Sequence, residues 1–145
     1  MPKNATASQA GMAHAIGIDG IRQISIIAHN LPRATAFYRD VLGLPLLFTP
    51  GNLAFFDCGG VRLMFGPASA PELDHPSSIL YFRVPDVQAA HEHLVNRGVK
   101  IEAPPRLIAR METYDLWMVG FRDSEGNIMQ LMSEVPRSAQ PSSAA

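Results

Sequence analysis

The segment that decides the fold is Gln23-Ile-Ser-Ile-Ile-Ala-His-Asn30, which continues as Leu31-Pro-Arg-Ala-Thr-Ala-Phe-Tyr-Arg-Asp-Val-Leu-Gly-Leu44. Its first half alternates weakly between apolar and mixed positions, which is typical of a strand with one buried face. Asn30 is a favoured helix-capping residue, and proline is favoured in a first helical turn. A glycine such as Gly43 commonly ends a helix in the left-handed conformation. The segment therefore predicts a strand, a tight turn and a helix.

The same order of signals returns later in the chain. Ile79-Leu-Tyr-Phe-Arg-Val-Pro-Asp86 leads into a second helical segment, 87–96, which is followed by Gly98. Gln23 stands seven residues before the expected helix cap Asn30, and Ile79 stands seven residues before the expected cap Asp86. Each position in one copy of an internal repeat has an equivalent in the other. The chain is therefore expected to contain one structural unit twice.

Further short strands complete each unit. In the first unit, apolar runs bounded by glycine-containing turns occur at 46–48, 53–57 and 61–65. In the second unit, strands are predicted at 78–84, 100–103, 116–122 and 128–133. Pro104-Pro105 is expected to stop the second of these, before an irregular excursion at 106–115. The order is βαβββ twice, which indicates an α+β fold. The expected parts are a flexible tail at 1–20, a first module at 21–66, a linker at 67–77, a second module at 78–134 and a C-terminal tail at 135–145.

Composition narrows the class of protein. The chain has 145 residues, of which 47% are hydrophobic and 17% charged, enough to bury a core without disulfides. Its formal net charge of −1 argues against nucleic acid or an anionic membrane surface as partner, because both require a clustered basic patch. The single cysteine, Cys58, has no internal partner, which fits a reducing, cytoplasmic location.

Three segments carry a resemblance to a known family. They are Phe37-Tyr-Arg-Asp-Val-Leu-Gly-Leu44, Asn96-Arg-Gly-Val99 and Phe121-Arg-Asp-Ser-Glu-Gly-Asn127. Over residues 21–134 the chain resembles the vicinal oxygen chelate superfamily, which includes glyoxalase I, bleomycin-resistance proteins, extradiol dioxygenases and methylmalonyl-CoA epimerase. The resemblance implies that the two βαβββ modules form a cupped, mixed and largely antiparallel eight-stranded sheet with the helices on its outer face. In metal-dependent members, the ligands lie on the first and last strand of each module and face into the cup.

Carried over to this chain, the resemblance assigns the four metal-ligand positions to Gln23, Met64, Ile79 and Gln130. Divalent zinc, nickel, iron or manganese needs three or four nitrogen or oxygen donors, usually including an anionic one. Two amides, a thioether and an alkyl group do not supply that set. We therefore expect no cofactor, although a divalent metal held by an atypical ligand set is an alternative, and we interpret Gln23 and Gln130 as hydrogen-bonding pocket residues.

Alternation adds further ligand-binding candidates. Ser25 shares the mixed face of the first strand with Gln23, and Tyr81 and Arg83 share a face with Ile79. A guanidinium at Arg83 could bind a carboxylate, phosphate or enolate. The equally weighted alternative is that Arg83 only pairs with a neighbouring acid such as Asp86 or Asp123.

Three functional classes fit these residues. The first is a metal-free protein that binds a small organic molecule, an anion among the options, in the manner of drug-sequestering resistance proteins. The second is a metal-dependent lyase, isomerase or dioxygenase with an atypical ligand set. The third is a metal-independent enzyme, for which the sequence offers no convincing general base. The missing metal donors favour the first class. Because edge strands of cupped sheets favour pairing, and because relatives commonly dimerise, a homodimer is also expected.

Overall fold

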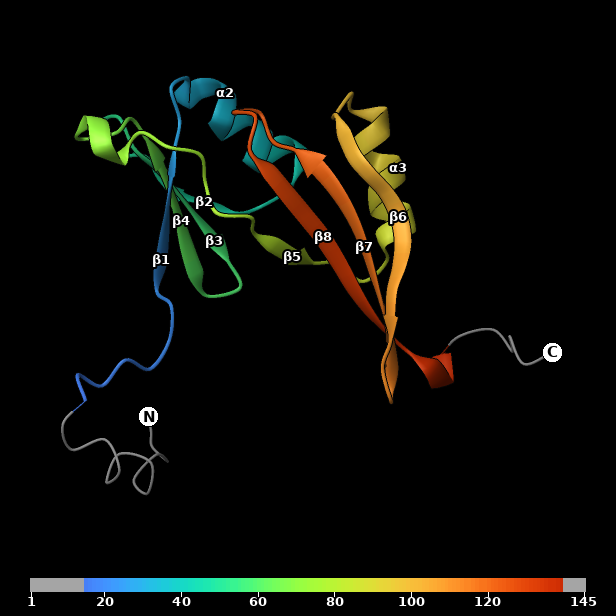
Figure 1. Ribbon diagram of the computed structural model, residues 1–145. Helices are drawn as coiled ribbons and strands as arrows, with labels where there is room; N and C mark the ends of the chain where they lie inside the picture. The colour runs from blue at the N-terminus through green and yellow to red at the C-terminus, as the bar shows by residue number, and fades with distance from the viewer. Residues whose placement is uncertain (1–14, 140–145) are drawn as a thin grey trace.

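The computed structural model describes residues 15–139 (Figure 1). Most of the expected N-terminal tail and the end of the expected C-terminal tail therefore lie outside the described residues. The first module contains β1 (Gln23–Ile27), α2 (Leu31–Ala36), the π-helix η1 (Phe37–Val41), β2 (Leu46–Phe48), β3 (Ala54–Cys58) and β4 (Val61–Gly66). A 3-10 turn, η2 (Pro71–Leu73), lies in the connection. The second module contains β5 (Tyr81–Arg83), α3 (Val87–Asn96), β6 (Ile101–Arg110), β7 (Tyr114–Arg122) and β8 (Ile128–Pro136), followed by the 3-10 turn η3 (Arg137–Ala139).

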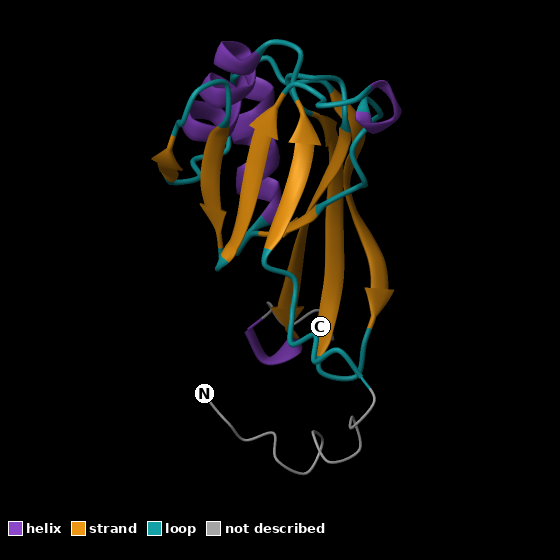
Figure 2. Cartoon of the chain, turned by 90° about the vertical axis from the view of Figure 1, so that its left-hand side faces the viewer, coloured by secondary structure: helices purple, strands orange, loops and turns teal. Residues whose placement is uncertain are grey.

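The two modules have the same topology. Their strands form two four-stranded sheets, in the orders β1-β4-β3-β2 and β5-β8-β7-β6. In each sheet the first strand runs parallel to the last one, and the other pairs are antiparallel. The helices pack on one side of the strands (Figures 1 and 2). The prediction of an α+β fold with βαβββ repeated and helices on the outer face is therefore confirmed.

Both helices begin and end where the sequence indicates. The Asn30 side chain accepts a hydrogen bond from the backbone N–H of Arg33, and the Asp86 side chain accepts two from the first turn of α3. Gly43 and Gly98 follow the helices with φ angles of 78° and 75°. Because L-residues with a side chain rarely adopt this left-handed conformation, glycine is the residue that fits there.

Two strands differ from the sequence prediction. Strand β6 continues through Pro104-Pro105 to Arg110 instead of stopping at residue 103. The reason is its position at the edge of the sheet, where an unpaired side tolerates proline, and its register with β7 shifts between Ala103 and Arg106. Strand β8 reaches Pro136, past the expected end of the second module.

Strand β5 is shorter than expected. The predicted strand at 78–84 holds only Tyr81–Arg83, so Ile79 lies just before the strand with a 47% exposed side chain. The backbone N–H groups of Ser77 and Leu80 donate to the side chains of Asn127 and Met129 instead of to a strand backbone. Pairing with β8 therefore starts only at Tyr81.

The modules share one core, which lies between their helices and the helix-covered faces of both sheets. Tyr38, Phe56 and Phe65 are fully buried in the first module, and the Phe37 ring stacks on Phe121 of the second at 6.5 Å between centroids.

Polar contacts also join the modules: the Arg33 guanidinium binds the almost fully buried carboxylate of Glu125 at 2.9 Å. Burial raises the pKa of Glu125, but the hydrogen bonds and charge of Arg33 oppose it, and that pKa lies below its usual value. Within the described part of the chain, no helix is long and apolar enough to cross a membrane.

Candidate functional site

The face of the first sheet that points away from the helices, the cup face, carries a connected polar group. Gln23 stands opposite Arg62, and Ser25 opposite Met64, in the parallel pairing of β1 with β4. The amide oxygen of Gln23 accepts a hydrogen bond from Nε of Arg62 at 2.9 Å, and its amide nitrogen lies 3.7 Å from Sδ of Met64. Gln23 is therefore fixed between its two neighbours on β4.

Aromatic side chains continue this face across the sheet. Phe55 on β3 stands opposite Met64, and the Arg62 guanidinium carbon lies 5.9 Å from the Phe55 ring centroid. The ring of Phe48 stacks on Phe55 at 4.6 Å. A guanidinium near the face of an aromatic ring is favoured by the ring quadrupole. The first sheet thus presents one positive charge beside an apolar surface.

The corresponding face of the second sheet carries the other predicted residues. Tyr81 stands opposite Gln130, and Arg83 opposite Met132. Both Tyr81 and Arg83 are exposed, and no described residue forms a hydrogen bond or ion pair with Arg83. The alternative of pairing with Asp86 or Asp123 does not occur, because Asp86 caps α3 and Asp123 accepts hydrogen bonds within the β7–β8 turn and from Tyr38.

Gln130 has room for its side chain because residue 120 is a glycine. A methyl group on Gly120 would lie 3.1 Å from the Gln130 amide nitrogen. The amide oxygen Oε1 is buried and has no hydrogen-bond partner within residues 15–139. A buried acceptor without a partner costs free energy. A ligand that donates a hydrogen bond would relieve that cost.

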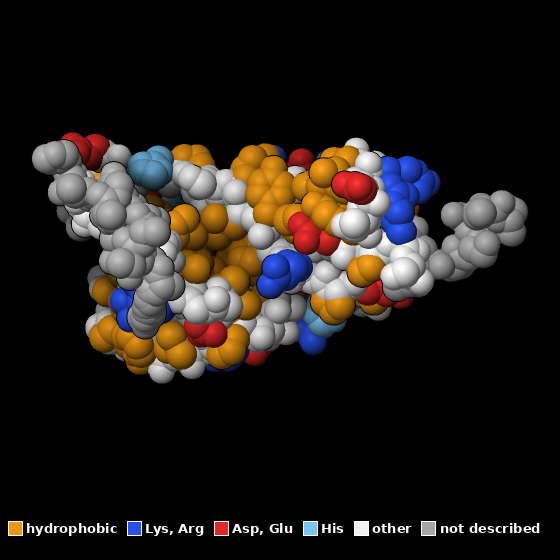
Figure 3. Space-filling view, turned by 90° about the horizontal axis from the view of Figure 1, so that it is seen from below, with side chains coloured by type: hydrophobic (Ala, Val, Ile, Leu, Met, Phe, Trp, Pro, Cys, Tyr) orange, Lys and Arg blue, Asp and Glu red, His pale blue; other side chains and the backbone are white. Residues whose placement is uncertain are grey.

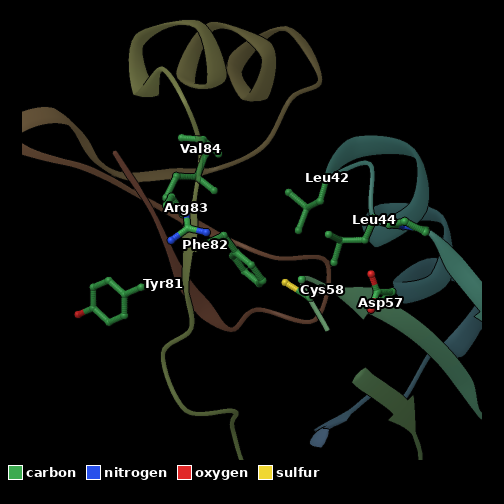
Figure 4. Close-up of a pocket in the computed structure, with 11 residues that line it drawn as sticks. Leu42, Leu44, Asp57, Cys58, Tyr81, Phe82, Arg83 and Val84 are labelled. Carbon is green, nitrogen blue, oxygen red and sulfur yellow. The ribbon is translucent and has the colours of Figure 1, made fainter. Parts of the chain in front are cut away.

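Two cavities flank these faces. One, of about 510 Å³, lies between the end of the first helix and β5. Its walls are apolar, with Leu42, Leu44 and Phe82 among them, while Asp57 and Arg83 also line it (Figure 4). Phe82 points toward Cys58, whereas Tyr81 points away from it. The Cys58 thiol is half-buried, and burial together with the charge of Asp57 raises its pKa, so this cysteine is a poor nucleophile.

The second cavity, of about 460 Å³, lies beside β1 under the connection between the modules. Ser25 and Met64 line it together with apolar residues such as Ile27, Leu53 and Leu73. The connection also contributes polar side chains, namely Ser69, His75, Ser77 and Ser78. Seen from below, hydrophobic side chains floor a hollow in the surface, with basic side chains nearby (Figure 3).

The predicted site residues therefore fall into two sets. Gln23, Ser25 and Met64 lie on the first sheet, while Tyr81, Arg83 and Gln130 lie on the second. Neither of the two cavities is lined by residues of both sets. Ile79 belongs to neither sheet. Arg62, which sequence reasoning does not single out, lies on the same face as Met64 by simple alternation along β4.

The contacts of the four positions decide whether they suit a divalent metal. Gln23 Oε1 already accepts from Arg62, whose charge would repel a cation. Met64 offers a thioether and Ile79 offers nothing, which leaves only Gln130 Oε1. In residues 15–139, no three His, Cys, Asp or Glu side chains gather closely enough to hold a metal. These residues do not fit the divalent metal that the resemblance implies.

Comparisons with known proteins agree with this fold. The protein YraH of Bacillus subtilis (strain 168), itself uncharacterized, is 24% identical over 123 residues, which cover 75% of this chain and 94% of that protein. The crystal structure of a lactoylglutathione lyase from Agrobacterium tumefaciens matches with a TM-score of 0.63 at 24% identity, covering 81% of this chain and 95% of that one. The fosfomycin resistance protein FosX from Listeria monocytogenes matches with a TM-score of 0.65 at 19% identity, covering 81% and 94%.

Identities this low establish a common fold and leave the activity open. The sequence profile of one family, however, matches residues 20–131, which span both modules. This chain belongs to the Glyoxalase/Bleomycin resistance protein/Dioxygenase superfamily.

Proposed function

We propose that this protein binds a small organic molecule, without a divalent metal, in a cup lined by the faces of its two sheets that point away from the helices. The observation that carries the proposal is the set of contacts at the four family positions. The amide oxygen of Gln23 already accepts a hydrogen bond from Arg62. The buried amide oxygen of Gln130 has no partner among the described residues, so it can accept a hydrogen bond from a neutral or protonated group of a ligand. Such groups orient a ligand by hydrogen bonds, and Met64 and the neighbouring aromatic rings supply apolar contact.

The alternative is a metal-dependent lyase, isomerase or dioxygenase; lyase is the activity named for the similar Agrobacterium protein. It would require a different donor set from the one these residues supply. Mass spectrometry of small molecules released from the purified protein tests the binding proposal directly. A bound organic compound at about one per cup supports it, while a protein that retains none and binds none from a broad metabolite set contradicts it.

Metal analysis separates the two functions. The purified protein should hold no stoichiometric zinc, nickel, iron or manganese, as measured by elemental analysis after dialysis. The double variant Ile79→His, Gln130→Glu adds an imidazole and a carboxylate, and it should bind Zn²⁺ measurably more tightly once Arg62→Met also frees the Gln23 amide. One tightly held ion per native chain, lost on Gln23→Leu, would contradict the metal-free proposal.

Arg83 should matter for anionic ligands only. The variant Arg83→Met keeps the side-chain length and removes the charge. It is expected to weaken binding of a carboxylate or phosphate ligand by about 1.5–3 kcal/mol, which is the usual contribution of a charged hydrogen bond. Calorimetric titration with a charged ligand and its neutral amide or ester measures the difference. An equal loss for both ligands would assign Arg83 a structural role.

A homodimer would bring the two sets of residues together. Strands β1 and β5 are both edge strands, so neither is paired on its outer side within the chain. Large apolar side chains are exposed next to both edges, Ile18 and Ile21 before β1 and Ile79 and Tyr81 at β5. Placing β1 of one copy beside β5 of the other would cover these side chains and form two cups, each from the first sheet of one chain and the second sheet of its partner. Light scattering at micromolar concentration should give the mass of two chains, and the mass of one would contradict this arrangement.

A further inference from the structure

We propose that Arg62, held by Gln23, is a fixed positive charge of the cup and binds the anionic group of an organic anion with an apolar body. This inference rests on the proposed function, because it names the class of ligand that the cup takes.

The hydrogen bonds around Gln23 aim the guanidinium. The Gln23 amide nitrogen points to Met64 Sδ at 3.7 Å, which turns the amide oxygen toward Nε of Arg62 at 2.9 Å. The Phe55 ring, 5.9 Å from the guanidinium carbon, flanks the same group. Gln23 uses only Nε, so the two Nη atoms retain their N–H donors. A planar guanidinium with free Nη donors is suited to a carboxylate, sulfonate or phosphate.

Among residues 15–139, no carboxylate neutralises the charge of Arg62. Arg62 forms no ion pair with any carboxylate in the described part of the chain. Asp57 stands opposite it on β3, but its Oδ1 accepts from the backbone N–H of Gly60 at 3.2 Å. The half-buried Arg62 therefore keeps a net positive field toward the cup, which Asp57 weakens without pairing.

The surroundings of Arg62 define the rest of the ligand. Phe55 and Phe48 form a stacked aromatic surface on one side of it. Met64 contacts Gln23 and also lines the cavity of about 460 Å³ beside β1, where Ile27 and Leu53 form an apolar part of a wall that also contains serines and His75. An anionic group at Arg62 can thus be continuous with an apolar or aromatic body in that cavity. The ligand class is an amphipathic organic anion of small size.

Two fluorescent probes with nearly the same body test this assignment. 8-Anilinonaphthalene-1-sulfonate carries a sulfonate, and N-phenyl-1-naphthylamine lacks it. Both should bind the native protein. Arg62→Met should weaken the sulfonate probe about tenfold or more and leave the neutral probe within about twofold, since only the charged hydrogen bonds are lost. Gln23→Leu should weaken the sulfonate probe by a smaller factor, because the charge remains but its orientation is freed.

Asp57→Asn is the matched variant, for which the opposite change in affinity for the sulfonate probe is expected. It keeps an acceptor for Gly60 and removes the negative charge, so it should tighten the sulfonate probe a few-fold without affecting the neutral one. An equal loss of both probes in Arg62→Met, or a sulfonate affinity that depends on Arg83 and not on Arg62, would overturn the inference while leaving the binding function intact. If the native protein bound neither probe, the proposed function itself would fail, and this inference with it.

Discussion

Replacing Asp123 by alanine is expected to lower the free energy of unfolding by about 3–4 kcal/mol, because it leaves several buried hydrogen-bond donors without an acceptor. Asp123 is 6% exposed and accepts four hydrogen bonds. One comes from the hydroxyl of Tyr38 in the first module, at 2.7 Å, and the others come from Glu125 and Asn127 in the turn after β7. Burial, and then the charge and hydrogen bond of Asp123, raise the pKa of Tyr38 well above its usual value, so its hydroxyl stays a donor.

Urea denaturation at one fixed protein concentration measures this loss, with unchanged slope as the sign that only stability has changed. Tyr38→Phe removes a single donor and leaves Asp123 with three others, so it should cost only about 1 kcal/mol. Asp40→Ala, which removes an exposed carboxylate paired with its neighbour Arg39, should leave the urea midpoint unchanged. If Asp123→Ala also left the urea midpoint unchanged, the hydrogen bonds between the β7–β8 turn and the first module would not contribute to stability.

The fold could be predicted from the sequence because its signals are local. Asn30, Asp86 and the glycines after the helices set the helix ends through backbone geometry that only a few residue types favour. The prediction that the strand ends at Pro104-Pro105 was wrong because it used local signals alone. Local chemistry predicts a break there, but whether a strand survives proline depends on its position at the sheet edge. The position of a strand within its sheet is set by tertiary structure, which local sequence signals do not contain.

The candidate site was predicted only in part, because family positions carry no information about their neighbours. Gln23 and Gln130 lie on sheet faces as the repeat indicates, and the poor metal donor set could be read directly from the residue types. The hydrogen bond that commits Gln23 to Arg62 links strands that are far apart in sequence. Alternation along β4 places Arg62 beside Met64, but it does not say which polar partner the guanidinium takes. The division of the site between two sheets likewise depends on how the modules pack.

Co-expression of two differently substituted chains is expected to restore ligand binding that each substitution abolishes alone. Ser25→Trp fills the first-sheet face, and Arg83→Glu reverses the charge on the second; both side chains are exposed, so neither change should disturb the core. Each homodimer should lose binding of 8-anilinonaphthalene-1-sulfonate. A heterodimer purified through a different tag on each chain combines the unaltered first sheet of one chain with the unaltered second sheet of the other.

Such a heterodimer should bind the probe with native affinity at about half the number of sites per dimer, because one of its two cups carries both substitutions and the other carries none. Calorimetric titration separates site number from affinity, and a heterodimer with both substitutions on one chain provides the matched control. If each chain built its own cup, the two singly substituted chains would remain inactive together, and the control heterodimer would bind with one native cup from its unaltered chain. In the shared arrangement, the control instead has one substitution in each cup and binds nothing. The two arrangements therefore predict opposite results for the same pair of complexes, and the pairing of β1 with β5 of a second copy is decided by which complex binds.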